Sequence, residues 1–175
     1  MKLTVLYYGH PALRGKAQTI ETINDEIVRL ANDMIETMLH HDGIGLAGPQ
    51  VGKLLRIFVM REEFFDNVGN YSFGPPEVII NPVLTDPSKE IESMLEGCMS
   101  LPKLHIPVTR PKKIRIRYQN LKGEFIEEYL ETFRGRMMMH ENDHLNGVLT
   151  IDRMDPKERR KLEPILRAMK QKYNP

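Results

Sequence analysis

The sequence has a single cysteine, Cys98, so no disulfide can form within the chain and the thiol is free for packing or chemistry. It also lacks an excess of one charge, because 25 Lys and Arg residues face 24 Asp and Glu residues. A near-neutral chain is not expected to bind nucleic acid over its whole surface, so we expect no specific DNA partner. No stretch approaches the roughly 20 apolar residues that span a bilayer, and no signal peptide is evident. We expect a cytoplasmic protein with no membrane partner.

The composition is that of a folded protein. Of the 175 residues, 41% are apolar and 28% are charged, which is enough apolar surface to build a core. We find no repeat, low-complexity tract or linker. The sequence therefore predicts one domain that covers residues 1–175.

Three segments have helical patterns. Apolar residues recur every three or four positions from Ile23 to Leu39, which predicts an amphipathic helix. Thr132 to Asn146 contains no proline and is followed by Gly147, a residue that suits a helix C-cap. After Asp155 and Pro156 a charged C-terminal helix is predicted, with a disturbance at Pro164.

The middle of the chain has strand patterns. Leu55–Met60 is a nearly continuous apolar run typical of a buried strand, and Val78–Leu84 is β-branched but contains Pro82, which favours an edge or a strand end. Lys113–Tyr118 alternates apolar and basic residues, and Glu124–Leu130 can pair with it as a hairpin.

The segment from Arg61 to Glu77 is rich in Gly, Pro and Asn and is predicted to be a loop or excursion. It also carries four aromatic residues, Phe64, Phe65, Tyr71 and Phe73. A mobile lid, a self-association surface and a segment packed against the body are three alternatives that remain open.

The strongest chemical signal is His140-Glu141-Asn142-Asp143-His144. Residues four apart lie on one face of a helix, so both imidazoles can bind one metal ion while Glu141 reaches a water on that ion. The alternative is two surface histidines beside ordinary helix charges. Taken with the segments above, the pattern predicts an α+β domain of mainly antiparallel strands around a central H-E-x-x-H helix, with an N-terminal amphipathic helix and a C-terminal helix.

Two histidines leave a catalytic metal short of a third protein ligand. Cys98, in the segment Glu96-Gly97-Cys98-Met99-Ser100, offers a thiolate that would bind a divalent ion well. The alternative is a small buried apolar residue, which is the usual state of a lone cysteine.

A glycine-rich turn, Gly43 to Gly52, precedes the first predicted strand. It lacks the spacing of a phosphate-binding loop, because no Lys-Ser or Lys-Thr follows the glycines. A turn of this kind can expose backbone groups and point the amide of Gln50 into a cleft.

Three segments together, Gly43–Gln50, Glu96–Ser100 and His140–His144, resemble the three signature motifs of the peptide deformylases in residues, order and separation. The resemblance implies an enzyme that removes the N-formyl group from the initiator methionine of nascent polypeptides. It also implies attack by a metal-bound hydroxide and a general base/acid. By the resemblance, the cofactor is one divalent ion, with Fe²⁺ expected and Zn²⁺, Ni²⁺ or Co²⁺ as other ions that suit such a site.

The resemblance also assigns residues. The metal ligands it implies are Cys98, His140 and His144; the catalytic residues are Glu141 as base, with Gln50 and the N–H of Met99 as donors to the oxyanion. Ile44 and Gly45 would hold the substrate backbone as an added strand. Met94, Phe133, Arg136 and Met137 would line the pocket for the methionine side chain, Arg136 with its stem while its charged head stays in water. Met94 and Phe133 suit ordinary core positions equally well.

The chain departs from the family pattern at two positions. Met139 stands where the family usually has Gln, and Gly48 stands where it usually has Ala. Met139 is expected to alter hydrogen bonding around the metal, and Gly48 to add backbone freedom before Gln50.

Other charged groups suggest structural roles or partners. Asp143 is expected to form an ion pair that orients the site, with Arg110 as a candidate partner. The basic C-terminal helix is either a solvated surface or, by the resemblance, a surface that docks on the ribosome.

Two other functions also fit parts of the pattern. A metallopeptidase uses the same H-E-x-x-H helix but normally has a His or carboxylate as third ligand. A non-enzymatic domain with a structural metal could bind RNA or ribosomes through the basic helix, although structural sites usually have four protein ligands.

Overall fold

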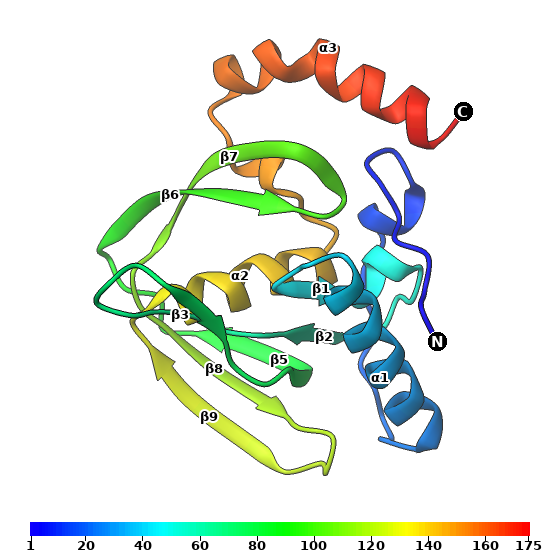
Figure 1. Ribbon diagram of the computed structural model, residues 1–175, viewed down its shortest axis with the longest axis vertical. Helices are drawn as coiled ribbons and strands as arrows, with labels where there is room; N and C mark the ends of the chain where they lie inside the picture. The colour runs from blue at the N-terminus through cyan, green and yellow to red at the C-terminus, as the bar shows by residue number, and fades with distance from the viewer.

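A five-stranded antiparallel sheet and the helix α2 (Phe133–Leu145) form the centre of the computed structural model, which describes residues 1–175 (Figure 1). The strand order is β1 (Gly45–Ala47), β2 (Ile57–Met60), β5 (Glu77–Thr85), β8 (Ile114–Gln119) and β9 (Phe125–Leu130). α2 covers one face of this sheet through Met137, Met138 and Met139. The predicted α+β fold with a central H-E-x-x-H helix is confirmed.

The helix α1 (Asp25–His40) belongs to a second apolar cluster with the sheet. Phe58 and Met60 of β2 pack in the cluster that contains α2, whereas Ile57 and Val59 pack in the cluster that contains α1. Because successive strand residues face opposite sides, a strand buried on both faces must be apolar throughout. This explains the apolar run Ile57–Met60 within the predicted strand.

A two-stranded ribbon, β6 (Ile91–Cys98) and β7 (Leu101–Pro111), lies apart from the main sheet (Figure 1). It contributes to a third apolar cluster with α3 (Pro156–Tyr173) and two short 3₁₀ helices, η1 (Pro11–Arg14) and η3 (Thr150–Arg153). A further 3₁₀ turn, η2 (Gly48–Val51), follows β1. The sequence does not predict the ribbon, since β6 is exposed at most positions and has no alternating pattern.

The expectation that Pro82 marks an edge or a strand end is wrong. Pro82 lies inside β5, which pairs with β2 on one side and β8 on the other, so β5 is a central strand. The ladder with β8 shifts register between Ile80 and Val83, and this irregularity is where a residue without an N–H is tolerated. Pro164 is exposed within α3, and the helix continues through it to Tyr173.

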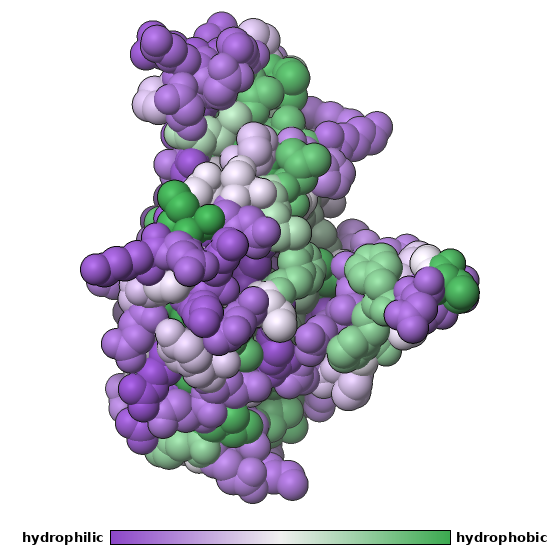
Figure 2. Space-filling view, turned by 90° about the vertical axis from the view of Figure 1, so that its left-hand side faces the viewer, coloured by the Kyte–Doolittle hydropathy of each residue, from purple (hydrophilic) through white to green (hydrophobic).

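The excursion after β2 forms a hairpin, β3 (Glu63–Phe65) and β4 (Tyr71–Phe73). Phe65 is 72% exposed and Tyr71 is 62% exposed, so the alternative of a segment packed against the body is wrong. Figure 2 shows an arm with apolar side chains that stands away from the rest of the surface, where this hairpin lies. No helix of the chain combines the length and apolar character needed to cross a membrane.

Buried Tyr118 of β8 predicts an alkaline weakness in the sheet. Burial and the neighbouring Glu128 carboxylate raise the pKa of Tyr118 to about 12, and its hydroxyl donates to Glu128 Oε2 at 3.2 Å. In the unfolded chain the tyrosine pKa is about 10, so between these values only the unfolded state loses the proton. Stability should therefore fall as pH rises from about 10 to 12, by up to about 2 kcal/mol from this group.

The matched variant is Tyr118→Phe, which cannot ionise. Urea unfolding of both proteins at about pH 8 and across the alkaline range measures the difference. We expect the native protein to be more stable by about 1 kcal/mol near pH 8, where the hydrogen bond is intact, and to lose this advantage above pH 10. Parallel stability curves for the two proteins would contradict the assignment.

Candidate metal centre

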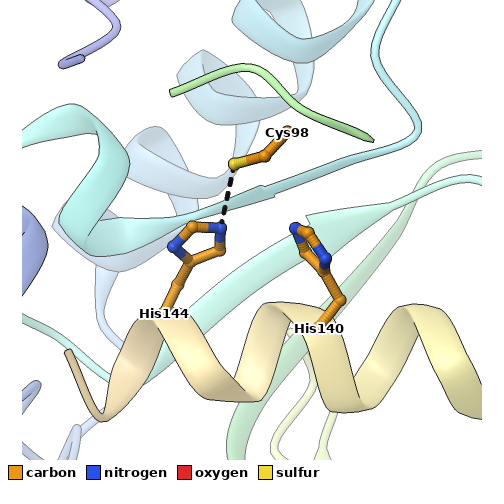
Figure 3. A group of neighbouring side chains, drawn as sticks. All are labelled: Cys98, His140 and His144. Carbon is orange, nitrogen blue, oxygen red and sulfur yellow. Dashed lines mark hydrogen bonds between the residues drawn. The ribbon is translucent and has the colours of Figure 1, made fainter. Parts of the chain in front are cut away.

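The fold brings together three side chains that are far apart in the sequence. His140 and His144 project from one face of α2, one turn apart, and Cys98 at the end of β6 lies over them (Figure 3). One ligand atom from each residue lies within 4.8 Å of the others, and Cys98 Sγ is 3.3 Å from His144 Nε2. The four-residue spacing in the sequence is enough to place the two histidines side by side. The turn between β6 and β7 then brings the sulfur of Cys98 to them.

Glu96 is a functional residue that sequence reasoning missed. Its buried carboxylate accepts from Arg110 Nε and Nη2 at 2.7 and 2.9 Å, and its Oε1 lies 2.8 Å from His140 Nδ1. Burial would raise its pKa, but Arg110 and His140 hold the pKa of Glu96 well below its usual value. The carboxylate therefore stays ionised and orients the His140 ring so that Nε2 faces the cluster. Its place beside Gly97 and Cys98 is the only sequence signal for this role.

The same network of ion pairs also fixes α2 to the β6–β7 ribbon. Arg110 Nη1 donates to Asp143 Oδ2 at 2.9 Å, which confirms the expected ion pair. Arg153 also donates to Asp143, at 2.6 and 2.7 Å. Asp143, inside the H-E-x-x-H segment, thus holds the helix against β7 and η3.

Arg136 corrects an expectation, since its charged head is not in water. The residue is 5% exposed, and its guanidinium donates to Glu96 Oε2 at 2.6 Å. It also donates to the carbonyl oxygens of Val108 at 2.8 Å and Glu92 at 2.6 Å. A cation buried in this way must be paired, and two arginines share Glu96 for that reason.

Glu141 lies beside the cluster with a free oxygen. The side chain is buried, and its Oε2 has no hydrogen-bond partner within the protein. Burial raises the pKa of Glu141. A Cβ on Gly45 would come within 2.2 Å of Glu141 Oε1, so only glycine at the start of β1 leaves room for this carboxylate.

Gln50 has a fixed orientation. Its Oε1 accepts from Ala47 N at 2.8 Å, which turns the amide NH₂ toward Cys98 Sγ at 3.6 Å and Ser100 Oγ at 3.1 Å. The backbone N–H of Met99, in the turn after Cys98, has no acceptor within the protein. Two N–H donors therefore flank the Cys98 side of the cluster.

A cleft of about 590 Å³ opens over the cluster. Of the residues predicted to contact substrate, those that line it are Ile44, Gly45, Phe133, Arg136 and Met137. Met94 does not line it and is 38% exposed; the lining of β6 begins one residue later, at Leu95. The Arg136 guanidinium binds the carbonyls of Glu92 and Val108, and Val108 is the cross-strand partner of Met94. The guanidinium of Arg136 therefore joins α2 to both strands of the ribbon, whereas Met94 is exposed.

The two departures from the family pattern have different surroundings. A Cβ on Gly48 would lie 2.5 Å from the carbonyl oxygen of Lys53 and 2.8 Å from that of Leu55, so glycine is required by the close approach of this loop. Met139 is buried in the apolar cluster between α2 and the sheet.

The donor set fits a divalent metal ion. One thiolate and two imidazoles suit Zn²⁺ and neighbouring transition ions, and three protein ligands leave a position for water or substrate. Burial would raise the pKa of the Cys98 thiol, but His144 and His140 hold that pKa well below its usual value. The sulfur is thus held as the thiolate that metals bind.

An α+β fold with a partly buried Cys/His₂ cluster, a buried carboxylate beside it and an open cleft is typical of metal-dependent hydrolases. The family model described as polypeptide deformylase matches residues 2–160. A peptide deformylase of Thermotoga petrophila is 44% identical over 167 residues, which cover 93% of this chain and 96% of the relative. This chain belongs to the polypeptide deformylase family.

Solved structures of the same family have a similar fold. The crystal structure of peptide deformylase from Thermotoga maritima has a TM-score of 0.79 at 41% identity and covers 89% of this chain and 99% of its own. The enzyme from Ehrlichia chaffeensis has a TM-score of 0.85 at 30% identity and covers 98% of both chains. The chain is accordingly a hydrolase that removes the N-formyl group from nascent polypeptides, and its family is metal-dependent.

The cluster predicts that Cys98→Ser weakens metal binding. A serine hydroxyl is not ionised at neutral pH, so one anionic ligand is lost while the backbone and the two imidazoles remain. We expect the affinity for a divalent ion to fall by more than about 100-fold, which exceeds the usual effect of altering an outer-shell partner. Titration of the apoprotein with Zn²⁺ against a competing chelator measures this. Full affinity in the variant would exclude the sulfur as a ligand.

Proposed function

We propose that Cys98, His140 and His144 hold one divalent ion, with Glu141 as general base and then acid. In this proposal Gln50 Nε2 and the N–H of Met99 donate to the oxyanion. The observation that carries the proposal is the unpartnered Glu141 Oε2 beside three donor atoms that lie within 4.8 Å of one another. We further propose that residues 1–175 act as one catalytic domain, for which a single cooperative unfolding transition is the check.

Each residue has a distinct task in the reaction. A divalent ion in this site supplies Lewis acidity and lowers the pKa of a bound water from about 15.7 towards 7. Glu141 accepts the proton of the attacking water at its free Oε2, and then delivers it to the nitrogen of the leaving amine. Gln50 and Met99 N–H donate to the formyl oxygen as it becomes negative, so they bind the transition state more tightly than the substrate. The bond between Ala47 N and Gln50 Oε1 holds that donor in place before substrate arrives.

The substrate backbone has a place between two unpaired strand edges. β1 is the edge of the main sheet and β6 is an edge of the ribbon, and both line the cleft. An extended peptide can add to the edge of β1 at Ile44 and Gly45, which positions the formyl carbon near Glu141. Phe133, Met137 and the stem of Arg136 then surround the methionine side chain.

We propose Fe²⁺ as the resident ion, with Zn²⁺, Ni²⁺ or Co²⁺ as ions that the same ligands accept. Elemental analysis of protein purified without oxygen tests this assignment. Predominant Zn²⁺ in such a preparation would contradict it.

The partners follow from the substrate. Formyl-methionyl nascent peptides are made on ribosomes, so we propose that the chain works in the cytoplasm and docks on the ribosome through α3. Leu166 and Met169 of α3 face the core, while its basic residues are exposed or nearly so: Lys157, Arg159, Arg160, Lys161, Arg167, Lys170 and Lys172. One side of this helix therefore presents positive charge to an anionic partner.

Replacing Glu141 with Gln should separate catalysis from metal binding. The amide keeps the size of the side chain but cannot accept the proton, so we expect kcat on formyl-Met-Ala-Ser to fall by more than about 100-fold. Metal content and thermal stability should stay close to those of the native protein. Formate release is measured beside proteolysis of an unformylated protein.

Glu163→Gln, an exposed site on α3, is the matched control and should leave turnover unchanged. Undiminished turnover in Glu141→Gln would remove this residue from the mechanism. Cleavage of the unformylated protein without formate release would favour a metallopeptidase instead.

Charge reversal on α3 tests the ribosome proposal. Arg160→Glu with Arg167→Glu replaces two exposed cations on one side of the helix, and we expect ribosome affinity to fall about tenfold at low salt. Co-sedimentation with ribosomes measures binding, and hydrolysis of formyl-Met-Ala-Ser in the same preparations confirms an intact site. Equal sedimentation of both proteins would contradict docking through α3.

A further inference from the structure

The arm formed by β3 and β4, residues 63–73, has one aromatic face. Phe65 lies directly opposite Tyr71 in the strand register, and Glu63 lies opposite Phe73. Because opposite residues of an antiparallel pair point to the same side, Phe65, Tyr71 and Phe73 share one face. The ring centroids of Phe65 and Tyr71 are 6.3 Å apart, and those of Tyr71 and Phe73 are 5.5 Å apart. The three rings therefore form a continuous aromatic stripe along the arm.

The rest of the chain does not cover this aromatic stripe. Phe65, Tyr71 and the tip residue Val68 are mostly exposed, and Phe73 is 38% exposed; Figure 2 shows the arm standing away from the body. These four side chains leave roughly 400–500 Å² of mostly apolar surface in water, since an aromatic side chain can bury about 150–250 Å². A patch of this size is as large as the largest one on a typical monomer, and such patches often mark an interaction site.

The base of the arm is fixed to the body on both of its strands. Arg134 of α2 forms ion pairs with Glu62, just before β3, and with Glu77, at the start of β5 after the arm. Arg61 Nε donates to the carbonyl oxygen of Gly43 at 2.8 Å. A lid needs a hinge that can move, and these bonds hold the arm at the two points where a hinge would lie. The arm is therefore placed to meet another molecule rather than to close over its own cleft.

The tip of the arm is ordered by its own hydrogen bonds. Asp66 Oδ1 accepts from the N–H groups of Val68 and Asn70, both at 2.9 Å, and Asp66 Oδ2 accepts from Asn70 Nδ2 at 3.1 Å. These bonds lower the pKa of Asp66, so the carboxylate stays ionised and keeps its bonds at neutral pH. A surface that is ordered before binding loses little conformational entropy when a partner arrives.

The charges beside the aromatic stripe are self-complementary. The guanidinium carbon of Arg61 lies 3.8 Å from the centroid of the Phe73 ring, and Glu63 lies opposite Phe73 on the same face. Neither Arg61 nor Glu63 forms an ion pair within the chain. In a dimer with a two-fold axis, each contact between two residues occurs twice with the roles exchanged. One free cation and one free anion on the same face therefore allow two identical arms to form two reciprocal ion pairs.

We propose that the arm binds the arm of a second copy of this chain. The two aromatic stripes pack face to face about a two-fold axis, and Arg61 lies beside Glu63 of the partner subunit. The two surfaces together bury about 1,000 Å², which is less than the area of stable complexes and matches a weak, reversible dimer. The contact also stabilises the arm, because an isolated two-stranded hairpin is marginal in water until another layer covers it. This inference is independent of the proposed reaction, since each copy keeps its own cluster and cleft.

Sedimentation equilibrium of the metal-loaded protein over a range of concentrations tests the pairing. We expect a reversible monomer–dimer equilibrium with a Kd on the order of 10 µM. Phe65→Ser with Tyr71→Ser removes two of the three rings and should raise Kd by more than about tenfold. The matched control is Phe125→Ser with Tyr129→Ser, which replaces a comparably exposed Phe and Tyr on β9 and should leave Kd unchanged. Formate release from formyl-Met-Ala-Ser at concentrations where the native protein is monomeric should be the same for all of these proteins.

Charge exchange tests the two-fold geometry. Glu63→Arg alone and Arg61→Glu alone each place like charges opposite one another in the dimer, so each variant should dimerise about tenfold more weakly than the native protein. An equal mixture of the two variants restores both ion pairs, because each variant carries the charges that the other lacks. We expect the mixture to associate about tenfold more tightly than either variant alone.

Three results would overturn the inference. The first is a native protein that is still monomeric at about 200 µM, far above the expected Kd. The second is dimerisation that survives in the Phe65→Ser, Tyr71→Ser variant, or a mixture of the charge variants that associates no better than its components. The third is a raised KM for formyl-Met-Ala-Ser in the double serine variant under monomeric conditions, which would show that the arm acts as a lid on its own cleft.

Discussion

The site depends on one buried carboxylate. Glu96 of β6 is held by Arg110 of β7, by Arg136 of α2 and by His140. Taking these charges out of water is costly, and losing one partner of a buried pair typically costs about 3–5 kcal/mol, so the arrangement is stable only when complete. When all of these contacts are made, the β6–β7 ribbon is held at a fixed position over α2. Cys98, two residues beyond Glu96, then lies over the two imidazoles.

The second constraint on the site is the close packing of other atoms against two glycines, Gly45 and Gly48. Gly45 leaves the space that the Glu141 carboxylate occupies, and Gly48 allows the loop before Gln50 to pass against two backbone carbonyls. The free oxygen of Glu141 and the fixed amide of Gln50 both depend on these small residues. Reactive groups that are held before substrate arrives need no rearrangement during the reaction, which is the main source of electrostatic catalysis.

The outer parts of the chain complete the cleft around this centre. α3 packs on the ribbon through Leu166 and Met169, and its end reaches the N-terminal segment through Asn174. The residues that line the cleft therefore include Tyr7 of the N-terminal segment, Leu104 of β7 and Tyr173 of α3. The β3–β4 hairpin stands apart with its aromatic residues exposed and its base fixed to α2, which favours a self-association surface over a lid.

The sequence by itself determined the features that follow from local chemistry. Local patterns indicated the helices α1, α2 and α3 and the strands β2, β8 and β9: periodicity for α1 and β8, a proline-free stretch with a glycine stop for α2, and an apolar run for β2. The four-residue spacing of His140 and His144 indicated a shared ion, because such patterns depend only on near neighbours. Tertiary structure decided the rest. β6 is exposed at most positions and has no alternating pattern, Pro82 was tolerated in a central strand by a register shift, and the head of Arg136 was drawn inside by Glu96. Pairing between residues 14 to 44 positions apart in the chain leaves no local signal, because it arises only when the folded chain brings those charges together.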